Sequence, residues 1–232
     1  MAHKVWHHHG QMSEAFRTVM FLSASGGLQD AYTYIGRGKV FANAQTGNIV
    51  LMSQAAFNGD LSRVLHYLIP LLSFALGVAA AEVIHIRYRE AKHLHWRQLV
   101  LLVEILLLFG VGFIPNTLDL DANALVSFAC AMQVQAFRKV HGYPFASTMC
   151  IGNMRSGMES LVVYFHLHDK KVLHKALHYF GVILLFAFGA GVGAHCVGVF
   201  GNKTIWFSCA LLLVSLCFMF IQDEEEALKE KA

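Results

Sequence analysis

The sequence predicts an all-α integral membrane protein made of two inverted repeats, with about six transmembrane helices and two interrupted or re-entrant helices. Three observations predict this fold: an apolar composition, eight long segments that carry few charges, and a similarity between the two halves of the chain. Of the 232 residues, 56% are apolar and 14% are charged, whereas soluble domains are about 45–50% apolar and about 25% charged. A soluble domain of this size cannot hide so many apolar side chains, because much of its surface must face water.

Eight segments are apolar enough to lie in a bilayer, whose core of about 30 Å needs roughly 20 helical residues. They span residues 18–36, 40–57, 64–86, 98–114, 122–137, 143–165, 176–200 and 204–221. The second, fourth and fifth are short for a full crossing. We therefore expect an N-terminal cytoplasmic tail at 1–17, membrane repeats at 18–114 and 122–221, and an acidic, polar cytoplasmic tail at 222–232.

The two halves of the chain align with each other at a nearly constant spacing. A shift of 105 positions aligns Asp30 with Gln135, Asn43 with Thr148, Gly47 with Gly152 and Asn48 with Asn153. A shift of 112 then aligns Leu65-His66-Tyr67 with Leu177-His178-Tyr179, Phe74 with Phe186 and Gly77 with Gly189. Apolar helices resemble one another by chance, but the matching polar residues favour a true duplication.

Basic residues predict the orientation, because cytoplasmic loops of membrane proteins carry an excess of Lys and Arg. The basic link between the third and fourth segments (87–97) is therefore predicted to be cytoplasmic. If all eight segments cross, Lys170, Lys171 and Lys175 fall outside. If the second and sixth cross only halfway, these lysines, Arg138, Lys139 and both termini fall inside, which leaves Arg37, Lys39 and Arg63 on the other side. Each repeat then has three crossings, so the two halves run in opposite directions.

Two motifs carry a resemblance to a known family. Gly27-Leu28-Gln29-Asp30-Ala31-Tyr32-Thr33-Tyr34 and Val40-Phe41-Ala42-Asn43-Ala44-Gln45-Thr46-Gly47-Asn48 resemble the signature of the YoaK family, and Gln135-Ala136-Phe137-Arg138 is similar to its later motif. At Ile151-Gly152 the sequence departs from the family's second threonine-glycine pair. The resemblance covers residues 18–221. It implies a multi-pass protein of the bacterial inner membrane, usually drawn with six spans, and it implies no substrate.

The predicted site lies at the two helix breaks. Thr46-Gly47-Asn48 interrupts the second segment, and Gly152-Asn153 is its equivalent. If a half-helix begins at each break, its backbone N–H groups and positive dipole end suit an anion or a carbonyl oxygen. We add Asn43 and Gln135 as polar candidates nearby. The alternative is a packing contact through Gly47, with Asn48 bonding across helices.

Charges inside apolar segments are expensive, about 2.5–3.5 kcal/mol at a helix centre, and are functional candidates. Asp30 could carry a proton or cation, or could cap a neighbouring helix. Glu104 could cycle a proton or could be a hydrogen-bonded packing residue. Arg155 and Glu159 share a helix face; they could form a structural ion pair or open to bind an anionic or zwitterionic solute.

Other chemistry has weak support. The five cysteines form no C-x-x-C pair and are expected to be small buried apolar residues. His174-x-x-x-His178 has a spacing compatible with a metal but no carboxylate, so we expect no metal site, no cofactor and no enzyme. Whether His7, His8 and His9 are native is left open. A net charge of +3 does not favour nucleic acid.

We therefore expect a small-solute permease that works by alternating access, with the bilayer, the solute and, in one version, protons as its partners. A passive channel uses the same parts. The competing class is a membrane assembly or sensor protein that transports nothing. Gly189-x-x-x-Gly193 and Gly77-x-x-x-Ala81 predict close packing between the two repeats, with a homodimer as the alternative.

Overall fold

The computed structural model describes residues 16–89, 95–140, 143–144 and 147–229, and most of them are helical. The long helices are α1 Phe16–Ala31, α2 Gln45–Phe57, α3 Leu61–Tyr88, α4 Trp96–Val111, α5 Asp119–Ala136, α6 Cys150–Leu167, α7 Lys170–Phe200 and α8 Ile205–Lys229. A π-helical turn, η2 Tyr32–Gly36, continues α1, and 3-10 turns lie at η3 Asn116–Leu118 and η4 Gly201–Thr204. Two short strands, β1 Lys139–Val140 and β2 Tyr143–Pro144, pair antiparallel, which the sequence did not predict.

Every predicted apolar segment contains a helix, but the second and sixth are helical only in their later parts. Residues 37–44 precede α2 without forming a helix, and α6 begins only at Cys150. At about 1.5 Å per residue, the 13 residues of α2 and the 18 of α6 are about 20 and 27 Å long. The neighbouring helices α3 and α7 have 28 and 31 residues.

Aspartate side chains start the two longest helices. The Asp60 carboxylate accepts a hydrogen bond from the backbone N–H of Arg63 at the start of α3. The Asp169 carboxylate accepts one from Lys171 at the start of α7. Such caps satisfy N–H groups that have no partner inside the helix. The connections from α2 to α3 and from α6 to α7 are therefore both short and end on an aspartate.

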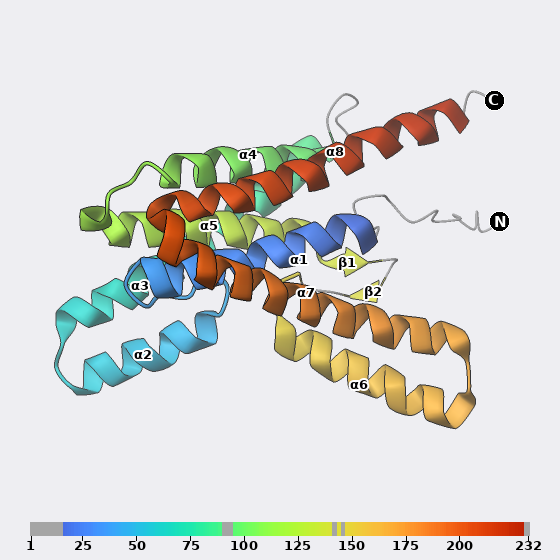
Figure 1. Cartoon of the computed structure of the whole chain (residues 1–232), viewed down its shortest axis with the longest axis horizontal. Coiled ribbons are helices and arrows are strands. Elements are labelled where there is room, and N and C mark those ends of the chain that lie inside the picture. Colours follow the sequence, from blue (N-terminus) through green and yellow to red (C-terminus); the bar gives the residue numbers. More distant parts are fainter. Residues whose placement is uncertain (1–15, 90–94, 141–142, 145–146, 230–232) are drawn as a thin grey trace.

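The helix bundle has two ends, which side-chain contacts define. We call the end where α1 begins the terminal face; there Phe16 stacks on His178 of α7 at 4.5 Å. At the opposite face Arg37 pairs with Asp119, and the Asn202 side chain donates to the carbonyl of Ile114. Figure 1 shows that α1 begins and α8 ends on the same side of the molecule.

Small residues allow the two halves of the chain to pack closely. A Cβ on Gly189 of α7 would overlap the carbonyl oxygen of Ala24 in α1, and one on Gly27 of α1 would overlap that of Phe186. A Cβ on Gly77 of α3 would overlap the carbonyl oxygen of Phe128 in α5. The predicted packing between the two halves is confirmed. These glycine faces are filled within one chain, so they are not free for a second copy.

The outer helices leave apolar surface uncovered. By length and composition, two helical stretches of the described chain could cross a membrane: Leu61–Tyr88, with a mean hydropathy of 1.9, and Lys170–Phe220, with 2.1. Only 22% and 17% of their most apolar windows are buried. Large exposed apolar residues on these stretches include Leu76, Leu184 and Phe188. Apolar surface of this extent suits a lipid environment.

Candidate functional site

A cavity of about 670 Å³ lies where α2 and α6 begin. Figure 1 shows that these two helices start near the middle of the molecule and run apart toward opposite ends. The cavity is lined by Asp30, Ala31, Tyr34, Ile35, Phe41, Asn43, Ala44, Gln45, Thr46, Phe74, Thr148, Met149, Cys150, Ile151, Gly152, Phe186 and Ala190. We call it the central cavity.

The central cavity is lined by residues that the two halves of the chain contribute in matching positions. The shift of 105 relates Asn43 to Thr148, Ala44 to Met149, Gln45 to Cys150 and Thr46 to Ile151, and all eight line it. The shift of 112 relates Phe74 of α3 to Phe186 of α7, which also line it. The two halves therefore build this cavity from corresponding segments.

The start of α2 is held in place by Asn48. Its side-chain amide accepts a hydrogen bond from the backbone N–H of Phe41 at 2.9 Å and donates to the carbonyl of the same residue at 2.7 Å. The Phe41 ring lies against Gly47, where a Cβ would come within 2.9 Å of it. Asn48 thus holds the non-helical residues that precede α2 against the start of that helix. It does not bond across helices, and neither Gly47 nor Asn48 lines the cavity.

The segment that leads into α2 and the one that leads into α6 both contact α1 at Gly26. The Asn43 backbone N–H donates to the Asp30 carboxylate at 2.7 Å, and its side chain donates to the Gly26 carbonyl at 3.2 Å. Thr148, the counterpart of Asn43, packs so closely on Gly26 that a Cβ there would overlap its methyl group. Asp30 is buried, and it serves as the acceptor for the chain that enters α2.

Neither helix that begins at the central cavity has a side-chain cap. The N-cap positions are Ala44 for α2 and Met149 for α6, and neither side chain accepts a bond from its helix. At α2 the backbone N–H groups of Gln45 and Gly47 already bond the carbonyls of Asn43 and Ala44, so the N–H groups open to a ligand lie mainly in the first turn of α6. The helix dipoles favour negative charge at both starts. Asp30 adds a carboxylate to the same cavity. Helix starts of this kind suit the negative end of a solute. The Asp30 carboxylate suits a proton or a positive group that accompanies it.

Glu104 lies outside the central cavity in a buried polar cluster. It is completely buried, and the Gln29 amide donates to its Oε1 at 3.3 Å. The same Gln29 nitrogen contacts Ser25 and Ser208, and the Cys130 thiol donates to Gln29 Oε1. Glu104 therefore has a hydrogen-bonded packing role, and its proton role stays a prediction.

The sequence profile described as "Protein of unknown function (DUF1275)" matches residues 18–218. The chain belongs to this family. A relative, "UPF0700 transmembrane protein YoaK" of Bacillus subtilis (strain 168), is 25% identical over 209 residues, which are 85% of this chain and 92% of the relative. No solved structure matches the chain. The resemblance to the YoaK family is confirmed, and this DUF1275 protein is a membrane protein.

Several predicted site residues of this DUF1275 protein lie away from the central cavity. Arg155 and Glu159 are exposed on α6, and no ion pair joins them in the described structure. The Gln135 side chain donates to Glu82 at the terminal face, and Asn153 is buried in α6 without lining the cavity. Of the predicted site residues, the central cavity therefore brings together Asp30, Asn43, Thr46 and Gly152, and the solute-binding role of the others stays a prediction.

Sequence reasoning missed other residues of the central cavity. Phe74 and Phe186 form its apolar walls, and Thr148 and Cys150 belong to the start of α6. Their signal was present, because three of them are repeat partners of Asn43, Gln45 and Phe74. The cysteine expectation is also corrected. Cys130 and Cys209 are buried, but Cys217 is exposed, since the outer face of a membrane helix can be as apolar as its inner face.

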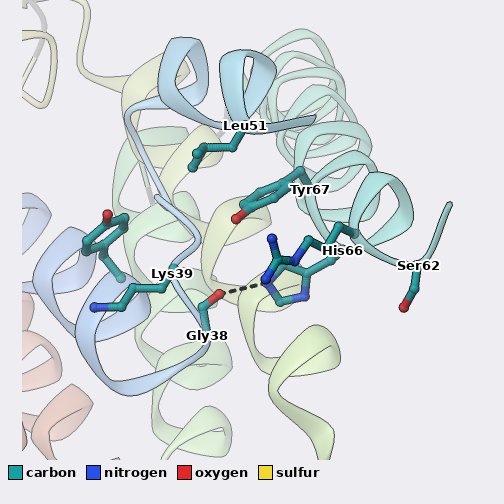
Figure 2. Close-up of a pocket in the computed structure, with 8 residues that line it drawn as sticks. Gly38, Lys39, Leu51, Ser62, His66 and Tyr67 are labelled. Atoms are coloured by element: carbon teal, nitrogen blue, oxygen red, sulfur yellow. Dashed lines mark hydrogen bonds between the residues drawn. The ribbon is translucent and has the colours of Figure 1, made fainter. Parts of the chain in front are cut away.

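A second opening lies at the opposite face, between the loop after η2 and the start of α3. It has a volume of about 500 Å³ and is lined by Tyr34, Gly38, Lys39, Leu51, Ser62, Arg63, His66 and Tyr67. Figure 2 shows the His66 ring bonded to the Gly38 carbonyl, with Lys39 and Tyr67 beside it. We call this opening the vestibule. No group of three or more potential metal ligands occurs in the described residues, and His7, His8 and His9 lie outside them.

Proposed function

We propose that this chain is a small-solute permease whose substrate binds in the central cavity. The observation that carries the proposal is the meeting of two helix starts, both without side-chain caps, beside Asp30 in a cavity of about 670 Å³. Small-molecule sites typically measure about 300–1,000 Å³. Interrupted helices that begin at a midplane site are a recurring design of secondary transporters. The preferred solute is a small anion or zwitterion.

We infer further that the two halves are inverted repeats. The helix pairings support this, because α1 packs on α7 just as its counterpart α5 packs on α3. Likewise α2 packs on α3 as α6 packs on α7. Helix directions agree: α1 runs toward the Arg37–Asp119 pair, whereas α5 starts from it. In this arrangement α2 and α6 enter from opposite faces, and the other six helices cross.

Charge supports an orientation with the terminal face in the cytoplasm of a bacterial inner-membrane protein. Eight described basic residues lie toward that face: Arg17, Arg87, Arg89, Arg97, Arg138, Lys170, Lys171 and Lys175. The opposite face has Lys39, Arg63 and Lys203, together with Asp60, Asp119 and Asp121. Arg37 also lies there, but it is completely buried and ion-paired. Both termini are then cytoplasmic.

A thermal-shift screen of the detergent-purified chain against small organic acids, inorganic anions and zwitterions tests the function. A ligand at 100 times its dissociation constant stabilises the folded state by about 2.7 kcal/mol. Gly152→Trp should abolish the shift, because Gly152 lines the central cavity and has open space around it. Gly198→Trp is the matched control on α7, where space is also open, and should retain the shift.

Flux measurements in reconstituted vesicles then separate the alternatives. A permease exchanges the bound solute across the membrane at a saturable rate, whereas a channel conducts without counterflow. A chain that binds the solute and moves none of it would instead be a sensor. If no compound raises the melting temperature in a way that Gly152→Trp abolishes, the permease proposal loses its basis. A role in membrane assembly is then favoured.

We propose a homodimer through the outer face of α6. Arg155 and Glu159 lie one turn apart on this face, among exposed Met154, Met158 and Val162. Lipid is a costly neighbour for an arginine. One cation and one anion on a single helix face are self-complementary, so a second copy related by twofold symmetry can pair each with its opposite.

A further inference from the structure

The vestibule has an excess of positive charge. Lys39 has no carboxylate within ion-pair distance in the described structure, and its ammonium lies 5.0 Å from the Tyr34 ring centre. Arg63 has its Nε 3.6 Å from Asp60, which offsets part of its charge. His66, Tyr67 and Ser62 add polar groups to the same lining. An opening of this kind attracts small anions to the opposite face.

The loop that carries Lys39 is held in an unusual conformation. Gly38 and Lys39 both have positive φ values, 86° and 69°. Few residues other than glycine adopt this left-handed region. The His66 ring, whose Nε2 lies 2.8 Å from the Gly38 carbonyl, ties the loop to α3 (Figure 2). The ammonium of Lys39 is therefore presented by a fixed turn.

The vestibule and the central cavity share one wall. Tyr34 lines both of them. Its ring stacks on Phe41 at 4.3 Å, with 17° between the planes, and Phe41 also lines the central cavity. Tyr34 belongs to the π-helical turn η2, and single π-helical turns are frequent at functional sites.

We propose that the vestibule is the anion-attracting entrance to the central cavity and that the Tyr34 ring is the barrier between them. This inference rests on the proposed function for its biological meaning, and it names the solute class as small carboxylates or phosphates. It predicts access through the opposite face. Two properties can be measured without knowing the solute or observing transport: the preference of the vestibule for anions, and the barrier that the Tyr34 ring forms.

The native thiol of Cys150 provides the test, because it lines the central cavity and is partly exposed. Cys196→Ser and Cys217→Ser remove the other accessible thiols, and Cys130 and Cys209 are buried. The probes are two membrane-impermeant methanethiosulfonates of similar size, one with a sulfonate and one with a trimethylammonium group. They are added to sealed vesicles of each orientation at low ionic strength, and the rate of Cys150 modification is followed by intact mass.

The vestibule should favour the sulfonate. Lys39→Glu should lower the ratio of sulfonate to trimethylammonium rates about threefold or more, and added salt should reduce the difference. Lys39→Gly removes the charge but suits the left-handed backbone, so it should lower the ratio less without affecting the fold. Lys203→Glu, an exposed cation at the same face outside the vestibule, is the matched control and should leave the ratio unchanged.

The barrier is tested with the same thiol. Tyr34→Ala should raise both modification rates, whereas Tyr34→Phe keeps the stacked ring and should leave them near those of the parent. An unchanged ratio in both Lys39 variants overturns the entrance, and unchanged rates in Tyr34→Ala overturn the barrier. Failure of solute transport with the labelling pattern intact would refute the permease and leave this access path standing.

Discussion

The guanidinium of Arg37, completely buried at the end of the first helix, lies 2.9 Å from the carboxylate of Asp119 at the start of α5. Its remaining donors are also used: Nε bonds the Tyr32 hydroxyl, and Nη2 bonds the carbonyls of Ile114 and Val111. The charge-based topology left Arg37 on the face that should carry few basic residues. The pair resolves this, because a neutralised, buried arginine is not a loop cation.

Replacement of Arg37 should therefore destabilise the fold. Arg37→Met leaves Asp119 and two carbonyls without their donor, and we expect the free energy of unfolding to fall by about 3–5 kcal/mol. Melting in detergent measures it, with Lys203→Met, an exposed cation at the same face, as the control. Equal melting temperatures for the two variants would contradict the structural role of the pair.

Two glycines on α7 should respond oppositely to alanine. Gly189→Ala places a methyl group into the carbonyl of Ala24, which should cost about 1–3 kcal/mol or more as the helices are pushed apart. Gly191→Ala meets open space and should be neutral or stabilise by up to about 1 kcal/mol, since alanine favours helix. Similar melting temperatures would mean that α1 and α7 do not cross closely at Gly189.

Asn48 should govern the start of α2. Asn48→Ala removes both bonds to the Phe41 backbone, and buried groups left without partners cost about 1–3 kcal/mol each. We expect a lower melting temperature and faster modification of Cys150, because the lead-in loosens beside the central cavity. The exposed neighbour Ile49→Ala serves as the control. Unchanged Cys150 modification in Asn48→Ala would argue against a role for Asn48 in holding the start of α2 in place.

Asp30 and Glu104 can be separated as proton carriers. Asp30→Asn retains an oxygen that accepts from Asn43, and Glu104→Gln retains one that accepts from Gln29, so both variants should fold. Asp30 lines the central cavity and Glu104 does not. We therefore expect Asp30→Asn to lose proton-driven uptake while solute exchange continues, and Glu104→Gln to keep both. Loss of driven uptake in Glu104→Gln alone would reverse the assignment.

The α6 face should show a charge-swap signature. Arg155→Glu and Glu159→Arg each place like charges across the proposed dimer contact and should raise the monomer fraction, measured by mass photometry or cross-linking in detergent. The double variant restores opposite charges and should recover the dimer. The two single variants should leave the central cavity unchanged, because neither residue lines it. A monomeric parent chain would refute the contact.

Much of the architecture could be read from the sequence. The eight apolar segments, two helix starts that lie within two residues of the predicted breaks at Gly47 and Gly152, and the packing role of Gly189 follow from local composition or from the repeat spacing. The site was harder to predict. Asn48 and Arg155 were both predicted to bind the solute, yet Asn48 is buried with its amide bonded to the Phe41 backbone, and Arg155 is exposed.

The sequence by itself determined the membrane class and the family, because these depend on composition and on the spacing of motifs alone. The tertiary structure decided which side chains share the central cavity. In water, the apolar face of a helix identifies its inner side. In lipid both sides are apolar, so rotation about the helix axis is set by contacts such as Gly27 against Phe186. Those contacts turned Asp30 and Phe186 inward and Arg155 outward.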